Sequence, residues 1–277
     1  LEAMGEVAYS RDKIDEAKTA LLAAREKLSP VLNEQPDNLE LLKTLGANAF
    51  WLGQIQYDAK NWLAVKPEFE LYYSYSQAMY KIAPDSVDAL MELSYATNSL
   101  GSLAMNLQEF EQATAFFDES LNLKLLAKAK DSGNTALIAD IADTRSWLAS
   151  AAAARGDAPK AIAVHQQIQG EFEMLGKNLK ADAYLLEKVF SSYSILASIY
   201  QHQGLVKQAF TKLYQAQNLL EQALSQDPAN KVWRIELFHI KTQLMRINVS
   251  LKDVRVSYRP ELLKLELDDE NKEFISE

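Results

Sequence analysis

The stretch that decides the fold is SVDALMELSYATNSLGSLAMNLQEFEQATAFFDESLNL, residues 86–123. Apolar residues recur every three to four positions on both sides of Gln108, which predicts two amphipathic helices with a break near that residue. The same pattern returns along the chain every 48 residues. The column that contains Leu100 holds Met4, Leu52, Leu148, Leu196 and Leu244.

Other columns keep the same register. Small residues follow the Leu column by one position, at Gly5, Gly53, Gly101, Ala149 and Ala197, and by thirteen, at Ala17, Val65, Ala113, Ala161 and Ala209. Residues that cap helix N-termini precede it by fourteen positions: Asn38, Ser86, Asn134, Asp182 and Asn230. Pro36, Pro84 and Pro228 stand two residues earlier in the same phase, where proline ends the preceding helix.

These columns identify a repeat protein whose units contact mainly their neighbours. We predict units near 1–37, 38–85, 86–133, 134–181 and 182–229, a capping helix at 230–252 and a C-terminal tail at 253–277. Only nine Gly and seven Pro occur in 277 residues, as long helices require. We expect Gly101 and Ala113 to face each other across one helix pair, with Phe117 filling the space beside them.

The motif resembles the tetratricopeptide repeat, whose signature contains L-G and then A-x3-F. Leu100-Gly101 and Ala113-x3-Phe117 match it, and Tyr200 fills the tyrosine place of another unit. The resemblance covers about residues 1–252 and implies an all-α, right-handed superhelix of antiparallel helix hairpins. The family period is about 34 residues, so this chain is a long-helix variant with helices of about 20 residues.

The resemblance implies a non-catalytic protein–protein interaction scaffold. Long-helix arrays of this kind are similar to the repeat regions of larger bacterial signalling or regulatory proteins. One alternative is a receptor for a small signal peptide or ligand, which would need a deep groove around Asn98, Ser146 and Ser194. Another is a self-association module that forms a homodimer through its aromatic end.

Charge and composition narrow the partners. The net charge of −9 argues against nucleic acid and anionic membranes, which need a basic surface. No apolar run is long enough to enter a membrane directly, and there is no cysteine. We therefore expect a protein or peptide partner. The sequence begins within a repeat's first helix, so we expect a fragment, cytoplasmic or the soluble region of a membrane-anchored protein.

In the tetratricopeptide family the first helix of each repeat lines the concave surface, which implies a partner-binding groove here. The groove residues that we predict are Asn98, Ser102, Met105, Ser146, Ser150, Ser194, Ser198 and His202. Small hydroxyls and amides could accept a peptide without strong charge selection, or they could simply be small residues in a tight curve. The cations of a carboxylate clamp are missing from these places.

Aromatic residues gather between positions 50 and 80. Tyr72, Tyr73 and Tyr75 spread over about 160° of a helix, so they cannot all face one core. We predict that at least one is exposed and serves an interface, with packing under the helix as the alternative.

No catalytic residues, cofactor or metal site are expected. His165 occupies the aromatic place of A-x3-F, so we predict a packed, hydrogen-bonded core histidine. The sequence contains no HExxH motif and no Gly-rich phosphate loop.

Overall fold

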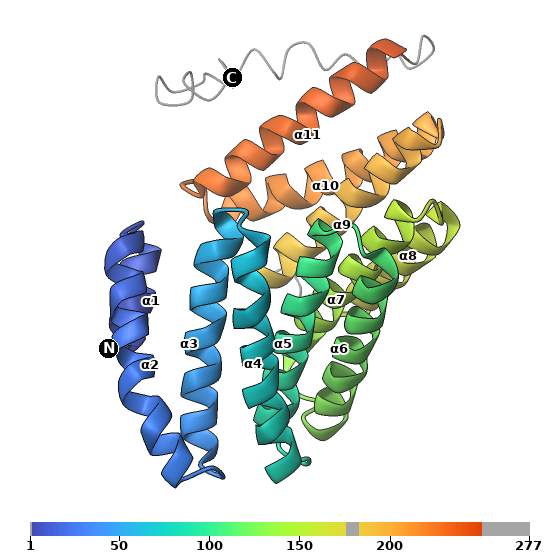
Figure 1. The fold of residues 1–277 in the computed structure, drawn as a ribbon. Coiled ribbons are helices and arrows are strands. Elements are labelled where there is room, and N and C mark those ends of the chain that lie inside the picture. Colours follow the sequence, from blue (N-terminus) through green and yellow to red (C-terminus); the bar gives the residue numbers. More distant parts are fainter. Residues whose placement is uncertain (1, 176–182, 251–277) are drawn as a thin grey trace. The chain divides into compact units, whose positions relative to one another are not determined.

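The computed structural model describes residues 2–175 and 183–250, which form eleven helices and no strand (Figure 1). The helices pack mainly against their neighbours in the chain, so the prediction of an all-α array of helix hairpins is confirmed. Their bounds are α1 (Glu2–Ser10), α2 (Ile14–Glu34), α3 (Leu39–Asp58), α4 (Trp62–Ile82), α5 (Val87–Asn106), α6 (Phe110–Lys130), α7 (Thr135–Ala154), α8 (Ala158–Leu175), α9 (Ala183–His202), α10 (Val206–Gln226) and α11 (Lys231–Ser250).

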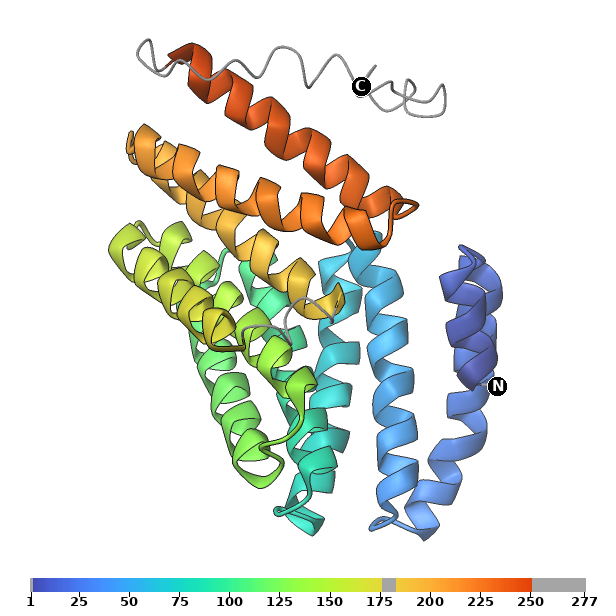
Figure 2. The same cartoon turned by 180° about the vertical axis from the view of Figure 1, so that it is seen from behind.

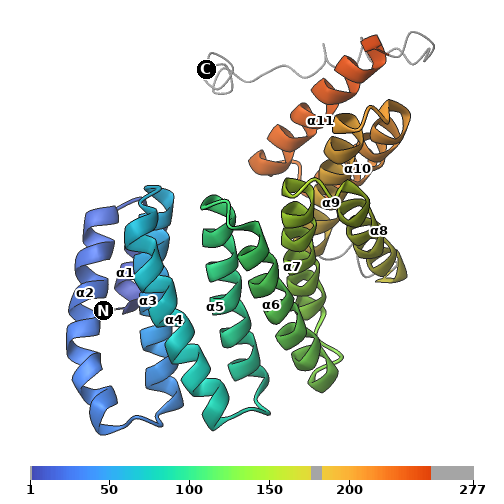
Figure 3. The ribbon, with the colours of Figure 1, turned by 45° about the vertical axis from the view of Figure 1, so that its right-hand side comes forward.

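The chain divides into two compact units, which the sequence did not predict. Unit 1 extends to Val164 and unit 2 begins at His165, so the boundary lies within α8. In unit 1, α3, α4, α5 and α6 pack against one another in chain order, as the views in Figure 2 and Figure 3 illustrate. The predicted tail and the predicted cap Asp182 lie outside the described residues.

The 48-residue period is confirmed in both units. The first helices α3, α5 and α7 begin at residues 39, 87 and 135, and α9 and α11 begin at 183 and 231. The predicted caps act as expected: the side chains of Asn38 and Ser86 accept hydrogen bonds from the backbone N–H groups of Leu41 and Ala89. All helices after α1 have 18 to 21 residues, as the long period requires.

Small residues let the two helices of a pair approach closely. A Cβ atom placed on Gly101 would lie 2.6 Å from Cε1 of Phe117, and one on Gly53 would lie 2.6 Å from Cδ1 of Phe69. Ala113 and Phe117 are fully buried. The predicted facing of Gly101 and α6 is therefore confirmed, and the aromatic ring occupies the space that glycine leaves.

The first helices α1, α3, α5, α7 and α9 end in the same turn. A residue with positive φ follows each of them, at every 48th position: Asp12, Lys60, Gln108, Gly156 and Gly204. In the turn after α5, Gln108 N–H donates to the carbonyl of Met105 and Glu109 N–H donates to that of Ala104. This Schellman pair of hydrogen bonds satisfies carbonyls that the helix end leaves free. The corresponding bonds occur in the other four turns.

Candidate functional site

Side chains join the first helices of unit 1 to one another. Trp51 Nε1 on α3 donates to Glu6 Oε1 on α1 at 2.6 Å. Lys43 Nζ on α3 donates to Asp88 Oδ1 on α5 at 2.5 Å. The hydroxyl of Tyr95 on α5 donates to Asp140 Oδ2 on α7 at 3.0 Å. Each pair is 45 residues apart, and we call the surface carried by α3, α5 and α7 the first-helix face.

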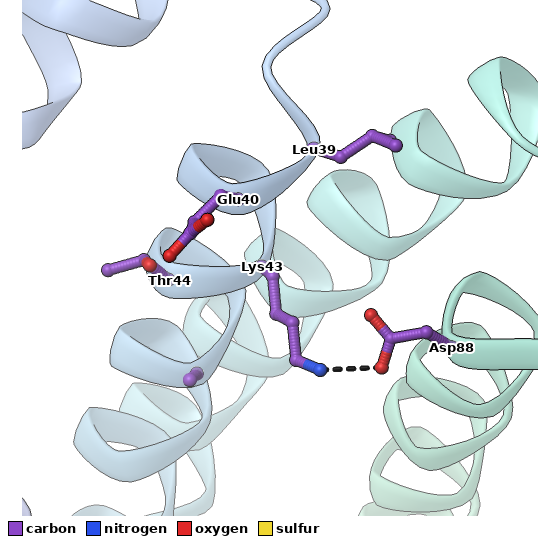
Figure 4. Close-up of a pocket in the computed structure, with 6 residues that line it drawn as sticks. Leu39, Glu40, Lys43, Thr44 and Asp88 are labelled. Carbon is purple, nitrogen blue, oxygen red and sulfur yellow. Dashed lines mark hydrogen bonds and ion pairs between the residues drawn. The ribbon is translucent and has the colours of Figure 1, made fainter.

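A pocket of about 580 Å³ opens on the first-helix face between α3 and α5 (Figure 4). Its lining residues are Leu39, Glu40, Lys43, Thr44, Ala47 and Asp88. Figure 4 shows the Lys43 ammonium beside the Asp88 carboxylate, while the Glu40 carboxylate stays apart from both. This pocket was not predictable from the sequence, because its two sides come from different repeats.

Carboxylates dominate the electrostatics of the pocket. Lys43 forms ion pairs with Asp88 at 2.5 Å and with Glu92 at 3.5 Å. The hydrogen bond that Lys43 donates to Asp88 and the charges of both carboxylates raise the pKa of Lys43, so its ammonium stays protonated at neutral pH. Within the described part of the chain, Glu40 forms no ion pair. Two carboxylates therefore pair with Lys43, and the carboxylate of Glu40 lines the same pocket without an ion-pair partner among the described residues.

The charge of unit 1 is distributed unevenly between its two sets of helices. The first helices α3, α5 and α7 contain six carboxylates and two cationic side chains, a net charge of −4. The second helices α2, α4 and α6 contain nine carboxylates and eight cationic side chains, a net charge of −1. Helices α3, α5 and α7 are therefore the more acidic of these two sets.

Lys124 reaches the first-helix face from α6 but is buried, with 2% of its surface exposed. Its Nζ donates to Thr144 Oγ1 at 2.8 Å and to the carbonyl of Asp140 at 3.2 Å, and lies 5.2 Å from the centre of the Tyr95 ring. This buried cation therefore links α6 to both α5 and α7.

The predicted groove residues of unit 1 are half-buried, and their hydroxyls are already bonded within their own helices. Ser102 donates to the carbonyl of Ser99, Ser146 to that of Ala142, and Ser150 to that of Ser146. Asn98 Oδ1 accepts from Thr144 Oγ1 at 3.4 Å. Met105 packs beside Phe117. Small size is therefore what the serines contribute to this face.

The predicted groove residues of unit 2 differ from one another. Ser198 and His202 are exposed. Ser194 is half-buried, and its hydroxyl oxygen is buried with no hydrogen-bond partner. A groove that joins these residues to those of unit 1 stays a prediction.

The aromatic prediction needs correction, because none of the three tyrosines is exposed. Tyr72 is a core residue with 5% of its surface exposed, and its hydroxyl donates to Glu92 Oε2 at 3.0 Å. Burial raises the pKa of Tyr72 well above its ordinary value. Tyr73 and Tyr75 are half-buried. The reason is that α4 packs against both α3 and α5, which cover it on two sides.

Tyr95 is the exposed aromatic residue of this face, with 38% of its surface accessible. Tyr95 was not among the residues predicted from the sequence, although its column in the repeat indicates an exposed position. The 48-residue register aligns Tyr95 with small or polar residues in every other unit: Ala47, Asp143, Ser191 and His239. An aromatic residue in a polar column indicates a surface position.

The prediction for His165 is confirmed. Its side chain is fully buried, and Nδ1 lies 3.1 Å from the Ser192 hydroxyl. Burial lowers the pKa of His165 to about 4, so the imidazole is neutral at pH 7.

In residues 2–175 and 183–250, no three His, Asp or Glu side chains are arranged to hold a metal ion. None of the helices in these ranges has the length and apolar character needed to span a membrane.

No protein-family model matches the sequence, and a search of curated proteins finds no match. Solved structures do share the fold. BtubC (BKLC) from P. vanneervenii is 15% identical, with a TM-score of 0.59 over 85% of this chain and 83% of that chain. The apo form of RapI is 14% identical, with a TM-score of 0.58 over 95% of this chain and 79% of that chain. Together with the helix pairs and the L-G and A-x3-F motifs, these likenesses show that the chain has a tetratricopeptide-like helical-repeat fold.

Proposed function

We propose that this chain is a non-catalytic protein–protein interaction scaffold that binds a segment of a partner protein on the first-helix face. The pocket between α3 and α5 is the observation that supports this proposal. It is open to solvent, and polar, charged and apolar groups converge on it, as in sites that bind peptide segments. The exposed Tyr95 lies one helical turn beyond Glu92 on the same helix and adds an aromatic anchor.

The chemistry of the pocket favours binding over catalysis. Lys43 is the cation of the pocket, and its raised pKa keeps it from acting as a base or a nucleophile at neutral pH. The strongly buried His165 lies in the core and is bonded to Ser192. A scaffold needs neither group to react.

The finer proposal is that the array belongs to a larger bacterial signalling or regulatory protein. It rests on the resemblance of long-helix arrays to the repeat regions of such proteins. The identity of a captured partner would support or overturn this part of the proposal without touching the scaffold function.

An affinity capture from the source cell extract tests the scaffold function. One bait is the 277-residue chain, and a second carries Ser102→Arg and Ser150→Arg, which place long side chains at equivalent positions of α5 and α7. A control bait carries Ala115→Arg, at an exposed position of α6. Circular dichroism and thermal melting first confirm that all three are folded.

We expect a protein that the unmodified and Ala115→Arg baits retain and that the double variant loses. A protein retained equally by all three baits would exclude the first-helix face as the binding surface. Retention of nothing but the chain itself would overturn the scaffold proposal and favour self-association or a small ligand.

A further inference from the structure

We infer that the pocket between α3 and α5 selects a partner segment in which a Lys or Arg side chain lies next to an apolar residue. This inference rests on the proposed scaffold function and names the chemistry of its partner. It follows from the shape of the pocket, from its carboxylates Glu40 and Asp88 and from the uneven charge of unit 1.

The apolar half of the pocket comes from α3. Leu39 has 38% of its surface exposed at the start of that helix, and Thr44 and Ala47 continue the wall along the next two turns. An aliphatic side chain that covered Leu39 and Ala47 would remove apolar surface from water, which stabilises a complex by about 25 cal/mol per Å².

The charged half decides which neighbour that aliphatic group must have. Lys43 is engaged by Asp88 and Glu92, so the cation of the pocket is already paired. Glu40 has no ion-pair partner in the described residues and lines the same pocket. An incoming ammonium or guanidinium would pair with Glu40 and share the field of Asp88, whereas an incoming carboxylate would be repelled by both.

The charge of the whole face acts in the same direction. The net charge of −4 on α3, α5 and α7, against −1 on α2, α4 and α6, directs cationic segments toward the first-helix face. Screening limits this field to about 8 Å at physiological ionic strength, so it acts close to the surface. The serines of the predicted groove show no such preference, which is why the sequence alone predicted weak charge selection.

Tyr95 extends the site along α5. It lies seven residues after Asp88 and three after Glu92, on the same stripe of the helix. Lys124 already lies over the Tyr95 ring, so the exposed part of this side chain offers a contact to an apolar group of the bound segment. A bound segment that fills the pocket would therefore continue over Tyr95.

Fluorescence anisotropy with labelled peptides tests the inference on the full 277-residue chain. The probes share one set of leucines, and the same variable positions hold only Lys, only Gln or only Glu. We expect the Lys peptide to bind about tenfold more tightly than the Gln peptide at about 0.15 M salt, and less tightly as salt rises. We expect no binding of the Glu peptide.

Glu40→Gln removes the unpaired carboxylate of the pocket and should weaken binding of the Lys peptide about two- to fivefold. The matched control is Glu26→Gln, at an exposed position of α2 with the same change in net charge. Glu26→Gln should leave the affinity unchanged, because that carboxylate lies on a second helix away from the pocket.

Equal binding of the three peptides, or no binding of any, would overturn the inference. Equal weakening by Glu40→Gln and Glu26→Gln would do the same, because it would show attraction to the whole protein and no pocket. The outcome is separable from the scaffold function. A captured partner that the Ser102→Arg and Ser150→Arg bait loses, but that a Glu40→Lys bait retains, would leave the scaffold proposal standing and the charge selection wrong.

Discussion

The helix pair α5–α6 in unit 1 and the helices α8 to α10 in unit 2 fill the same register with different chemistry. Seventeen positions after the Leu column, unit 1 has Phe69 and Phe117, each packed against a glycine. Unit 2 has the buried Leu213 at this position in one helix pair, and in another it has His165, bonded to Ser192. A buried glutamine, Gln169, follows one turn later and accepts a hydrogen bond from Lys212.

The buried polar atoms make the difference explicit. Among the described residues, all the buried side-chain atoms without a hydrogen-bond partner lie in unit 2: His165 Nε2, Gln169 Nε2, Ser194 Oγ, Gln215 Oε1 and Gln217 Oε1. A buried apolar side chain stabilises a helix pair simply by burial. A buried polar side chain must also have a hydrogen-bond partner for each of its donors and acceptors. The 48-residue repeat accommodates either an apolar or a polar side chain at this position. The stability of the two kinds of helix pair should therefore respond to different changes.

The largest loss of stability should come from removing the aromatic ring of Phe117 in unit 1. Phe117 is fully buried, so Phe117→Ala should lower the free energy of unfolding by about 3–5 kcal/mol, because it removes buried apolar surface and leaves a cavity. Chemical denaturation measures this change. Leu126→Ala, at a half-exposed position of the same helix, is the control and should cost much less. Equal costs would show that α6 lacks the packed core described above.

The free energy of unfolding should depend on pH because of the buried His165 in unit 2. The pKa of His165 is lowered from 6.5 to about 4 by burial, so its neutral form is the one that the fold accepts. Stability from this group is complete above pH 6.5 and is lost as the pH falls toward 4, up to roughly 3 kcal/mol. Denaturation curves at several pH values measure the loss.

His165→Leu is the control for the pH effect, because Leu213 occupies the same column. The difference in free energy of unfolding between the two proteins should change across this pH range, while the carboxylates contribute equally to both. Parallel pH profiles would contradict a buried neutral imidazole.

A smaller effect tests the close approach in unit 1. Gly101→Ala places a methyl group against the Phe117 ring and should cost about 1–3 kcal/mol by overpacking, less about 1 kcal/mol of gained helix propensity. Combining it with Phe117→Leu imitates Ala197 and Leu213 of unit 2. The double variant should lose less stability than the sum of the single variants, and strict additivity would show that the two residues do not interact.

The smallest expected change in stability distinguishes the turn at Gly156 from the equivalent turn at Gln108. Gly156→Ala puts a side chain at φ +83° and should cost about 1 kcal/mol. Gln108→Ala should change stability by less than about 0.5 kcal/mol, because Gln108 already holds a side chain at φ +61°. Thermal melting compares the two variants. A larger cost at Gln108 would mean that its side chain stabilises the turn.

Much of the fold could be predicted because its rules are local. The period, the caps Asn38 and Ser86 and the packing of Gly101 all depend on residues within one helix pair. A break near Gln108 was predicted, but the left-handed turns at Asp12 and Lys60 were not, because no glycine marks these positions.

The candidate site was less predictable because it depends on neighbouring repeats. The Lys43–Asp88 pair joins residues 45 positions apart, which no helical spacing connects. The burial of Tyr72 depends on α4 packing against both α3 and α5. Helical periodicity shows which side chains share a face, but it does not show which other helix covers that face.

The recurring turn makes the hairpins interchangeable. All five turns use the same backbone hydrogen bonds, and they differ in side chain. The direction in which the second helix of each hairpin leaves the first is therefore set by the main chain, and the side chains around the turn can change without redirecting that helix. A segment of 48 residues, such as 86–133, could be duplicated or deleted as a unit. The helix pairs on either side would then pack against another pair of the same geometry. Arrays of this type can therefore change in length while each hairpin acquires its own surface chemistry.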